Sequence, residues 1–186
     1  MFVRTKRLTL RPGWIEDAPE LTQAIAHWEV VRHLGRAPWP YAVQDAEAFL
    51  RQQKPSARAA TFLICARDGD AAPIIGAVDY GPRAERGGET GLGYWLTPAA
   101  WGQGYATEAA QAAVEVARVM GVKRIVASHF IDNPASGRVL RKLGFRPLRT
   151  ATQFSAARGA SAECAEMVLH LAQEAEDDPD LNRMAA

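Results

Sequence analysis

The glycine-rich stretch WGQGYA at residues 101–106 constrains the fold of this chain more than any other segment. It opens a run to Gly121 whose polar residues form one narrow stripe at helical spacing: Glu108, Gln111, Glu115 and Arg118. This pattern predicts a long, mostly covered helix that begins near Gly104. Glycine loses more backbone freedom on folding than any other residue, so two glycines directly before a helix require an explanation.

One explanation is an anion-binding site. The first amides of a helix have no partners within the helix, and the aligned peptide dipoles place roughly half a positive charge at that end. Because Gly102 and Gly104 carry no side chains, they leave these amides open to a phosphate or pyrophosphate. The alternative is a turn that only reverses the chain. The Lys-Ser or Lys-Thr pair of a P-loop and the third glycine of the dinucleotide fingerprint are missing, which disfavours the common nucleotide folds.

The rest of the sequence predicts a mixed α/β fold. Apolar runs predict strands at residues 7–12, 60–67, 73–81, 90–97, 123–130, 145–154 and 162–172. Helical spacing predicts helices at residues 16–28, 43–53, 104–121 and 133–144, with Asp17 as the cap of the first. Turn residues separate the three strands between residues 60 and 97, so we expect an antiparallel meander within one largely antiparallel central sheet.

Composition limits the possible partners and the location of the chain. The 186 residues suit one domain, and with 48% apolar residues and a net charge of +1 they lack the basic excess of many nucleic-acid binders. No apolar run reaches the length of a membrane span, and the first residues lack a secretory pattern, so we expect a cytoplasmic protein. Cys65 and Cys164 lack a partnered spacing and are interpreted as buried thiols, with no metal site. The acidic stretch 173–186 is interpreted as a mobile tail that follows a single domain at 1–172.

Three motifs together resemble the GNAT family of N-acetyltransferases, in particular its RimJ/RimL-like branch, which acetylates ribosomal-protein N-termini. They are TKRLTLRP at residues 5–12, LGYWLTPAAWGQGYATEA at 92–109 and NPASGRVLRKLGF at 133–145. The resemblance covers nearly the whole chain. It implies a twisted, mostly antiparallel sheet with helices on both faces and with the fourth and fifth family strands splayed apart. It also implies an acyltransferase that moves the acetyl group of acetyl-coenzyme A directly to a primary amine, without a metal.

The resemblance implies where the coenzyme binds. Backbone amides from Gly102 to Thr107 would hold the pyrophosphate, the strand Tyr94 to Thr97 would pair along the pantetheine arm, and an amide near Leu96 would polarise the thioester carbonyl. The implied coenzyme-binding residues are Trp95, Leu96, Thr97, Trp101, Gly102, Gln103, Gly104, Tyr105, Ala106, Thr107, Asn133 and Ser136. Trp101 departs from the family pattern, which has Gln or Arg at that place.

Ser136 is the expected catalytic acid, because NPAS places it one turn into the helix where the coenzyme thiol lies in similar proteins. The alternative is that Asn133 and Ser136 only serve the start of the helix, and both roles can coexist. Three cations stand near the end of that helix: Arg138, Arg141 and Lys142. They complement the negative helix terminus, and one of them is a candidate for the coenzyme 3′-phosphate.

The catalytic base is less constrained, because Gly91 stands where similar proteins often have Glu. Glu89, two residues earlier, would face the same side of an extended strand and is the expected base. Asp79 and His129 are rivals, and water can also carry the proton.

The resemblance implies that the acceptor enters from the side opposite the coenzyme, past the first two helices and the final hairpin. Its expected lining residues are His33, Arg36, Trp39 and Tyr41, with Glu163 or Glu166 attracting a cationic amine. A protein N-terminus, an amino acid, a polyamine and an aminoglycoside are all compatible acceptors. The alternatives to an enzyme are an acyl-coenzyme A sensor without turnover and an interaction module that kept the fold. Composition is equally compatible with a monomer and a homodimer.

Overall fold

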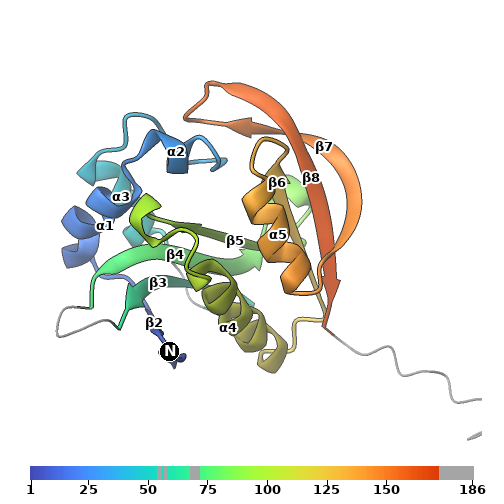
Figure 1. The fold of residues 1–186 in the computed structure, drawn as a ribbon, viewed down its shortest axis with the longest axis horizontal. Coiled ribbons are helices and arrows are strands. Elements are labelled where there is room, and N and C mark those ends of the chain that lie inside the picture. Colours follow the sequence, from blue (N-terminus) through green and yellow to red (C-terminus); the bar gives the residue numbers. More distant parts are fainter. Residues whose placement is uncertain (54–55, 57, 68–71, 172–186) are drawn as a thin grey trace, which may run out of the picture.

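A computed structural model describes residues 1–53, 56, 58–67 and 72–171 of the chain. Its centre is one eight-stranded sheet in the order β1-β2-β3-β4-β5-β6-β8-β7 (Figure 1). The strands are β1 (Val3–Arg4), β2 (Leu8–Arg11), β3 (Ala60–Ala66), β4 (Ile74–Pro82), β5 (Thr90–Leu96), β6 (Arg124–Phe130), β7 (Arg146–Ser155) and β8 (Ala160–His170). Neighbouring strands are antiparallel except β5 and β6, which are parallel. The mixed α/β class and the meander β3-β4-β5 are therefore confirmed.

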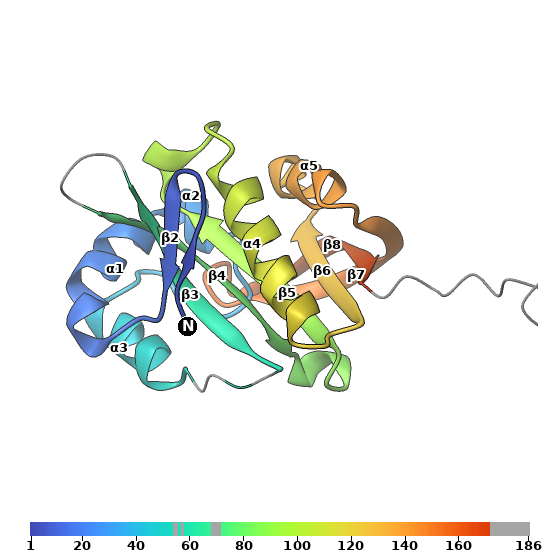
Figure 2. The same ribbon diagram turned by 90° about the horizontal axis from the view of Figure 1, so that it is seen from below.

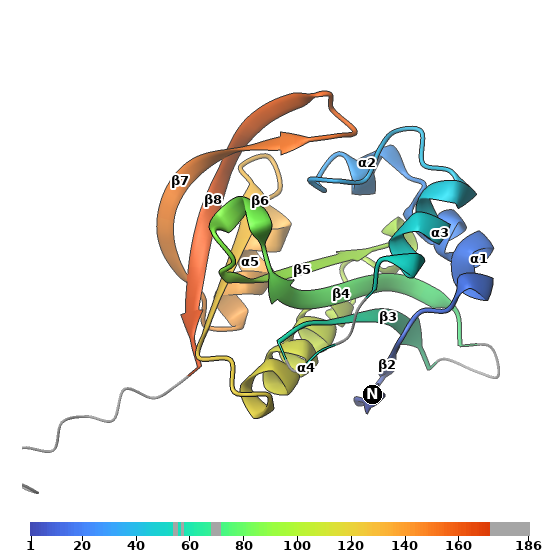
Figure 3. The same ribbon diagram turned by 180° about the vertical axis from the view of Figure 1, so that it is seen from behind.

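Helices cover both faces of the sheet, as the resemblance implied. One face carries α1 (Ala18–Ile25), α2 (Trp28–Val31) and α3 (Val43–Arg51), and the other carries α4 (Tyr105–Val119) and α5 (Pro134–Lys142). Figures 2 and 3 show α4 and α5 on the side of the sheet away from α1 and α3. Three short 3-10 turns complete the described elements: η1 (Ile15–Asp17), η2 (Ala84–Arg86) and η3 (Pro98–Ala100).

The strand period of two assigns alternate side chains to two separate cores. Along β3, Phe62 and Ile64 pack in the core beneath α4, whereas Leu63 and Cys65 pack with α1 and α3. The helix α4 meets the sheet through small side chains that are fully buried: Ala109, Ala110, Ala113 and Ala117. Alanine lets a helix lie close to a sheet, which fixes the start of α4 against the strands.

The sheet opens between its two parallel strands. β5 and β6 share a single register pair, Gly91 with Val126. On their other sides, β5 pairs with β4 and β6 pairs with β8 along their whole lengths. The two strands therefore part toward their carboxyl ends, near Leu96 and Phe130, and the expected splay is confirmed.

The first predicted helix is wrong in two respects. Instead of running over residues 16–28, it ends at Ile25, because Ala26 has ψ of 55° and His27 is extended before α2 begins. Asp17 does not cap it through its side chain. Its carboxylate instead accepts two hydrogen bonds from Arg11, at 2.7 and 2.8 Å, and one from the Trp14 amide at 2.8 Å. A bidentate guanidinium is a stronger partner than a helix amide, so Asp17 holds the 3-10 turn η1 to β2.

Cys65 and Cys164 are buried free thiols, as expected. Within the described residues, no cluster of three His, Cys, Asp or Glu side chains has the arrangement of a metal site. The helices of that same part of the chain are too short and too polar to cross a membrane. The proposed tail at 173–186 lies outside the described residues, so the domain boundary at 172 stays a prediction.

Candidate active site

A cavity of about 780 Å³ follows the opening between β5 and β6. On one face of the sheet it is lined by the loop before α4 and by the first turns of α5. On the other face it is lined by α2, by the segment that leads to α3, and by side chains of β3 and β4. One continuous space therefore joins the two faces of the sheet through the splay.

The glycine loop presents its backbone to this cavity. Gly102 and Gly104 have φ of 74° and 81°, which side chains rarely adopt, and a Cβ at Gly102 would meet no atom within 4 Å. Among the described residues, none accepts a hydrogen bond from the amides of residues 102–104, 106 and 107. Unpaired backbone donors at a helix start require an external partner. The loop therefore has the open backbone donors that the predicted anion site requires.

Trp101, the residue that departs from the family pattern, fastens this loop to the end of β5. Its indole Nε1 donates a hydrogen bond to the Leu96 carbonyl at 2.9 Å, while the indole remains half-exposed along the cavity. The Thr97 amide donates to Ile75 of β4 at 2.8 Å. Because backbone groups alternate in an antiparallel ladder, the amide of Leu96 points the other way, into the opening toward β6.

Ser136, the expected acid, forms a hydrogen-bonded pair with Tyr94 of β5. The Tyr94 hydroxyl lies 2.9 Å from Ser136 Oγ and 3.1 Å from the Ser136 carbonyl, and all of these groups belong to residues that line the cavity. Burial raises the pKa of Tyr94 to about 12, although the hydrogen bond with Ser136 lowers it. Tyr94 therefore keeps its proton at neutral pH. The Ser136 amide donates to Asn133 Oδ1 at 3.2 Å, so Asn133 is the cap of α5.

Sequence reasoning missed the role of Tyr94. The signal available was the two-residue period of the strand, which puts Tyr94 on the same face as Leu92 and Leu96. It does not reveal that α5 brings Ser136 to the Tyr94 hydroxyl, because that contact spans 42 positions of the chain.

The structure does not bring Glu89 into the cavity. Glu89 precedes the first residue of β5 and forms an ion pair with Arg124, the first residue of β6. It lies at the end of β5 opposite Leu96, and the cavity lining does not include it. Glu89 extends the β4–β5 ladder by one residue, since its carbonyl accepts from the Arg83 amide at 2.9 Å, but this end of β5 lies beyond the cavity lining.

Asp79 occupies the place that Glu89 was expected to take. A Cβ at Gly93 would lie 2.7 Å from Asp79 Oδ1, and a Cβ at Gly91 would lie 2.4 Å from Arg83 Nε. The two glycines of β5 thus leave space that is filled by side chains from β4 and the residue following it. Asp79 and Arg83 form an ion pair, and both line the cavity on the face opposite α4 and α5.

His129, the other rival base, lies on the coenzyme face. Its ring packs against α5, where a Cβ at Gly137 would approach His129 Nε2 to 2.5 Å, and its Nδ1 lies 3.0 Å from the Phe130 carbonyl. Of the three cations of α5, Arg138 and Lys142 line the cavity and Arg141 does not.

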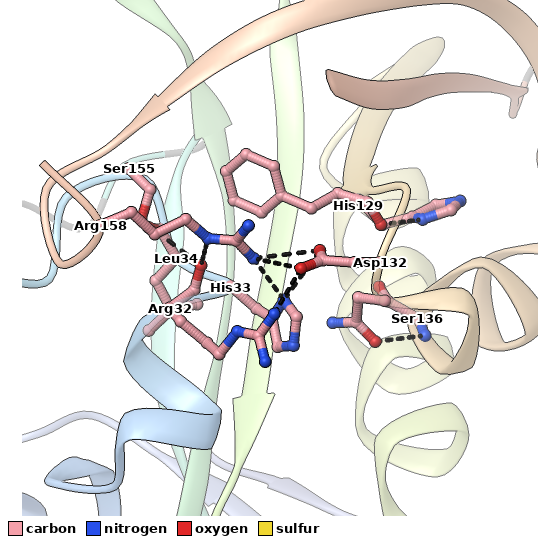
Figure 4. Close-up of polar contacts among 10 residues, drawn as sticks. Arg32, His33, Leu34, His129, Asp132, Ser136, Ser155 and Arg158 are labelled. Atoms are coloured by element: carbon pink, nitrogen blue, oxygen red, sulfur yellow. Dashed lines mark hydrogen bonds and ion pairs between the residues drawn. The ribbon is translucent and has the colours of Figure 1, made fainter. Parts of the chain in front are cut away.

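An ion cluster lies beside the cavity, between α2 and the start of α5 (Figure 4). Asp132, in the turn between β6 and α5, accepts hydrogen bonds from Arg32 at 2.5 Å and from Arg158 at 3.0 Å, with His33 Nδ1 at 3.6 Å. Arg158 Nε also donates to the Arg32 carbonyl at 2.6 Å. Burial is the main cause that lowers the pKa of His33, so its ring is held neutral beside these charges. The cluster ties α2, the β7-β8 hairpin and the start of α5 together.

The expected acceptor residues divide into two groups. His33, Arg36 and Tyr41 line the cavity. Trp39 is outside the lining, where its ring packs against Trp28 with centroids 5.8 Å apart.

Neither expected acidic residue of β8 reaches the cavity. Glu163 is exposed away from it, and Glu166 is buried between two cations, Arg86 at 2.9 Å and Arg149 at 2.7 Å. Their charges are therefore not available to an incoming amine.

Comparison with known proteins agrees with this geometry. Residues 7–146 match the model of the acetyltransferase (GNAT) domain. The chain is 27% identical to the N-acetyltransferase p20 of Bacillus licheniformis over 158 residues, covering 83% of this chain and 88% of that protein. It is 30% identical to the N-acetyltransferase YoaA of Bacillus subtilis over 151 residues, covering 78% and 82%. Both relatives are named as uncharacterized.

Solved structures share the fold at lower identity. A GNAT-family acetyltransferase from Bacillus anthracis superposes with a TM-score of 0.76 at 20% identity, covering 92% of this chain and 99% of that one. RimL, a ribosomal alpha-N-protein acetyltransferase in complex with coenzyme A, superposes with a TM-score of 0.77 at 18% identity, covering 91% and 98%. From the family match and the named relatives, we conclude that the chain belongs to the GNAT family and is an acetyl-coenzyme A-dependent N-acetyltransferase.

Proposed function

We propose that this enzyme transfers an acetyl group directly to a primary amine that enters from the face of α2 and α3, while the coenzyme lies on the face of α4 and α5. The observation that carries the proposal is the continuous cavity through the splay of β5 and β6. It has unpaired amides on one side of the sheet and the carboxylate of Asp79 on the other. Direct transfer requires both reactants in one space at bonding distance.

The coenzyme is held and aimed by backbone groups. Acetyl-coenzyme A supplies an activated acetyl thioester. The amides of residues 102–107 bind its diphosphate, and the end of β5 pairs along its pantetheine arm. The Leu96 amide, which points into the opening, polarises the thioester carbonyl, because a fixed donor stabilises the charge that develops on that oxygen.

Asp79 receives the amine on the other face of the sheet. Asp79 lines the cavity there and forms an ion pair with Arg83, and we assign it the roles of binding the ammonium group and accepting its proton. The deprotonated nitrogen then forms the new C–N bond as the C–S bond breaks. We assign this role to Asp79 instead of Glu89, because only Asp79 lines the cavity.

Ser136 serves the departing thiolate. Its hydroxyl lies at the start of α5 and is held by the Tyr94 hydroxyl, which keeps its proton at neutral pH. The Tyr94 hydroxyl donates to the Ser136 carbonyl and contacts Ser136 Oγ, and Ser136 donates its proton to the sulfur. Asn133 keeps Ser136 in place by capping the helix.

The acceptor is a primary amine, either a protein N-terminus or a small molecule. The likeness of the fold to RimL supports a protein N-terminus. The cavity supports an amine with an apolar neighbour, since Ile25, Val30 and Trp95 line the acceptor side.

An acceptor screen tests the proposal. Peptides with different N-termini, amino acids, polyamines and aminoglycosides are incubated with acetyl-coenzyme A, and thiol release and acetylated products are followed by mass spectrometry. We expect at least one acetylated amine, and the Asp79→Asn enzyme should not form it. If none of the amines causes thiol release, although coenzyme A stabilises the protein by about 2.7 kcal/mol at 100 times its Kd, the protein is instead a binding module.

A further inference from the structure

The N-terminal hairpin is fastened to the first turn of α4. The Thr5 hydroxyl donates to Glu108 Oε1 at 2.6 Å, and the Arg7 amide donates to the same oxygen at 2.8 Å. Arg7 Nε donates to Glu108 Oε2 at 2.8 Å. Burial alone would raise the pKa of Glu108, but the hydrogen bonds from Thr5 and Arg7 lower it below the usual value, so the carboxylate is ionised.

Arg7 also contacts the glycine loop. Its Nη1 donates to the Gln103 carbonyl at 2.8 Å, and its guanidinium lies 4.5 Å from the centroid of the Tyr105 ring. A Cβ at Gly104 would lie 3.5 Å from Arg7 Nη2. The Arg7 side chain therefore contacts the Gln103 carbonyl, the Tyr105 ring and the Glu108 carboxylate. All these contacts use oxygens or a ring face, so they leave the loop amides open.

The carboxylate of Glu108 creates an electrostatic conflict at this end of α4. A negative charge in the first turn stabilises a helix, but it also repels an anion that binds to the amides one turn earlier. Glu108 is 17% exposed, so water screens its charge poorly. The guanidinium of Arg7 lies directly against Glu108, on the side of the loop, and offsets this charge.

We propose that Arg7 is a coenzyme-positioning residue, which neutralises Glu108 and fixes the Gln103 carbonyl so that the loop amides can hold a diphosphate. The inference rests on the proposed binding of the coenzyme diphosphate at this loop. It assigns a function to the motif at residues 5–12, which is remote in sequence from every other coenzyme-binding residue.

The test compares the coenzyme A affinity of a single variant and a double variant with that of the wild type, measured by calorimetric titration. We expect Arg7→Gln to weaken binding about tenfold, because it leaves an unpaired carboxylate beside the diphosphate. The double variant Arg7→Gln with Glu108→Gln should recover most of that loss, since no unpaired charge remains. Arg4→Gln is the matched control, because it removes one positive charge from the same hairpin at an exposed position. It should bind within twofold of the wild type.

A truncated substrate supplies the second measurement. With S-acetyl-pantetheine, which has no diphosphate, kcat/KM of Arg7→Gln should equal that of the wild type, whereas with acetyl-coenzyme A it should fall about tenfold. Wild-type affinity in Arg7→Gln, no recovery in the double variant, or equal losses with both substrates would each overturn the inference while leaving the proposed function intact. A wild-type protein that does not bind coenzyme A would overturn both.

Discussion

The two halves of the cavity are built in different ways. The part of the proposed coenzyme half that would hold the diphosphate consists of backbone amides from one continuous segment, residues 101–107, at the start of one helix. The proposed acceptor half consists of side chains that distant segments bring together, including Asp79 and His33, the second of which contacts the ion cluster around Asp132. A backbone site is specified by adjacent residues, whereas a side-chain site exists only after the whole sheet has formed. We therefore expect the coenzyme half to respond to backbone changes and the acceptor half to changes of single functional groups.

The largest expected effect is in the acceptor half. Asp79→Asn should lower kcat/KM about 1,000-fold, within the range for loss of a general base, with unchanged affinity for coenzyme A. The matched control is Glu89→Gln, which should stay within threefold of the wild type because Glu89 lies outside the cavity. Steady-state kinetics with the acceptor found in the screen measure both. If Glu89→Gln lost more kcat/KM than Asp79→Asn, Glu89 would be the base.

The next effect is at the junction of the two halves. Ser136→Ala should lower kcat about 100-fold, because the thiolate loses its proton donor, while titration with coenzyme A gives wild-type affinity. Tyr94→Phe should lower kcat less, since Ser136 remains. An unchanged kcat in Ser136→Ala would remove this residue from the mechanism and leave Asn133 and Ser136 with a structural role.

A smaller effect is expected in the coenzyme half. Gly102→Ala should weaken coenzyme A binding about tenfold, because the methyl group enters the open space before the amides and strains a residue with φ of 74°. Gly87→Ala is a matched control, since Gly87 has φ of 62° and equally open surroundings but does not line the cavity and lies far in sequence from the glycine loop. Thermal unfolding should show similar losses of stability for both variants. Weakened coenzyme binding in Gly87→Ala would mean that backbone strain alone explains the result.

The smallest effect concerns the ion cluster around Asp132, beside the cavity. Arg158 is the main cause that lowers the pKa of Asp132 below 3.8, so this carboxylate stabilises the folded state above that pH and loses its contribution as the pH falls through the folded-state pKa. Asp132→Asn should lower the free energy of unfolding by about 1 kcal/mol at pH 7, because Asp132 is partly exposed to solvent. Urea unfolding at pH 7 and below pH 3 measures the difference, which should vanish in acid. Glu115→Gln, which breaks an exposed pair with Arg118, should change stability by less than Asp132→Asn. A pH-independent difference would contradict the ionic explanation.

The sequence predicted the loop and helices of the proposed coenzyme half, because their signals are local. Gly102 and Gly104 before an alanine-rich helix indicate an anion site from chain geometry alone, and Asn133 with Pro134 marks the start of α5. The family motifs also predicted the splayed sheet. Such features depend on residues within a few positions of one another.

The acceptor half was not predictable in the same way. Glu89 satisfied the strand period, but this end of β5 lies beyond the cavity lining and Arg124 pairs with the carboxylate. Asp79 was one candidate among several, because its place over Gly93 depends on the register between β4 and β5. The ion pair between Arg7 and Glu108 spans 101 positions of the chain, and local sequence does not indicate such a contact.

The single register pair between β5 and β6 leaves most of the facing backbone groups of these two strands without a strand partner. A row of backbone groups without a neighbouring strand usually lies at the rim of a sheet, where it recruits other chains into aggregates. Here the row lies in the middle of the sheet, with helices on both faces, and it borders a cavity of about 780 Å³, a volume typical of small-molecule sites. The enzyme thus has unpaired strand groups inside the sheet, where an extended ligand can form hydrogen bonds with them.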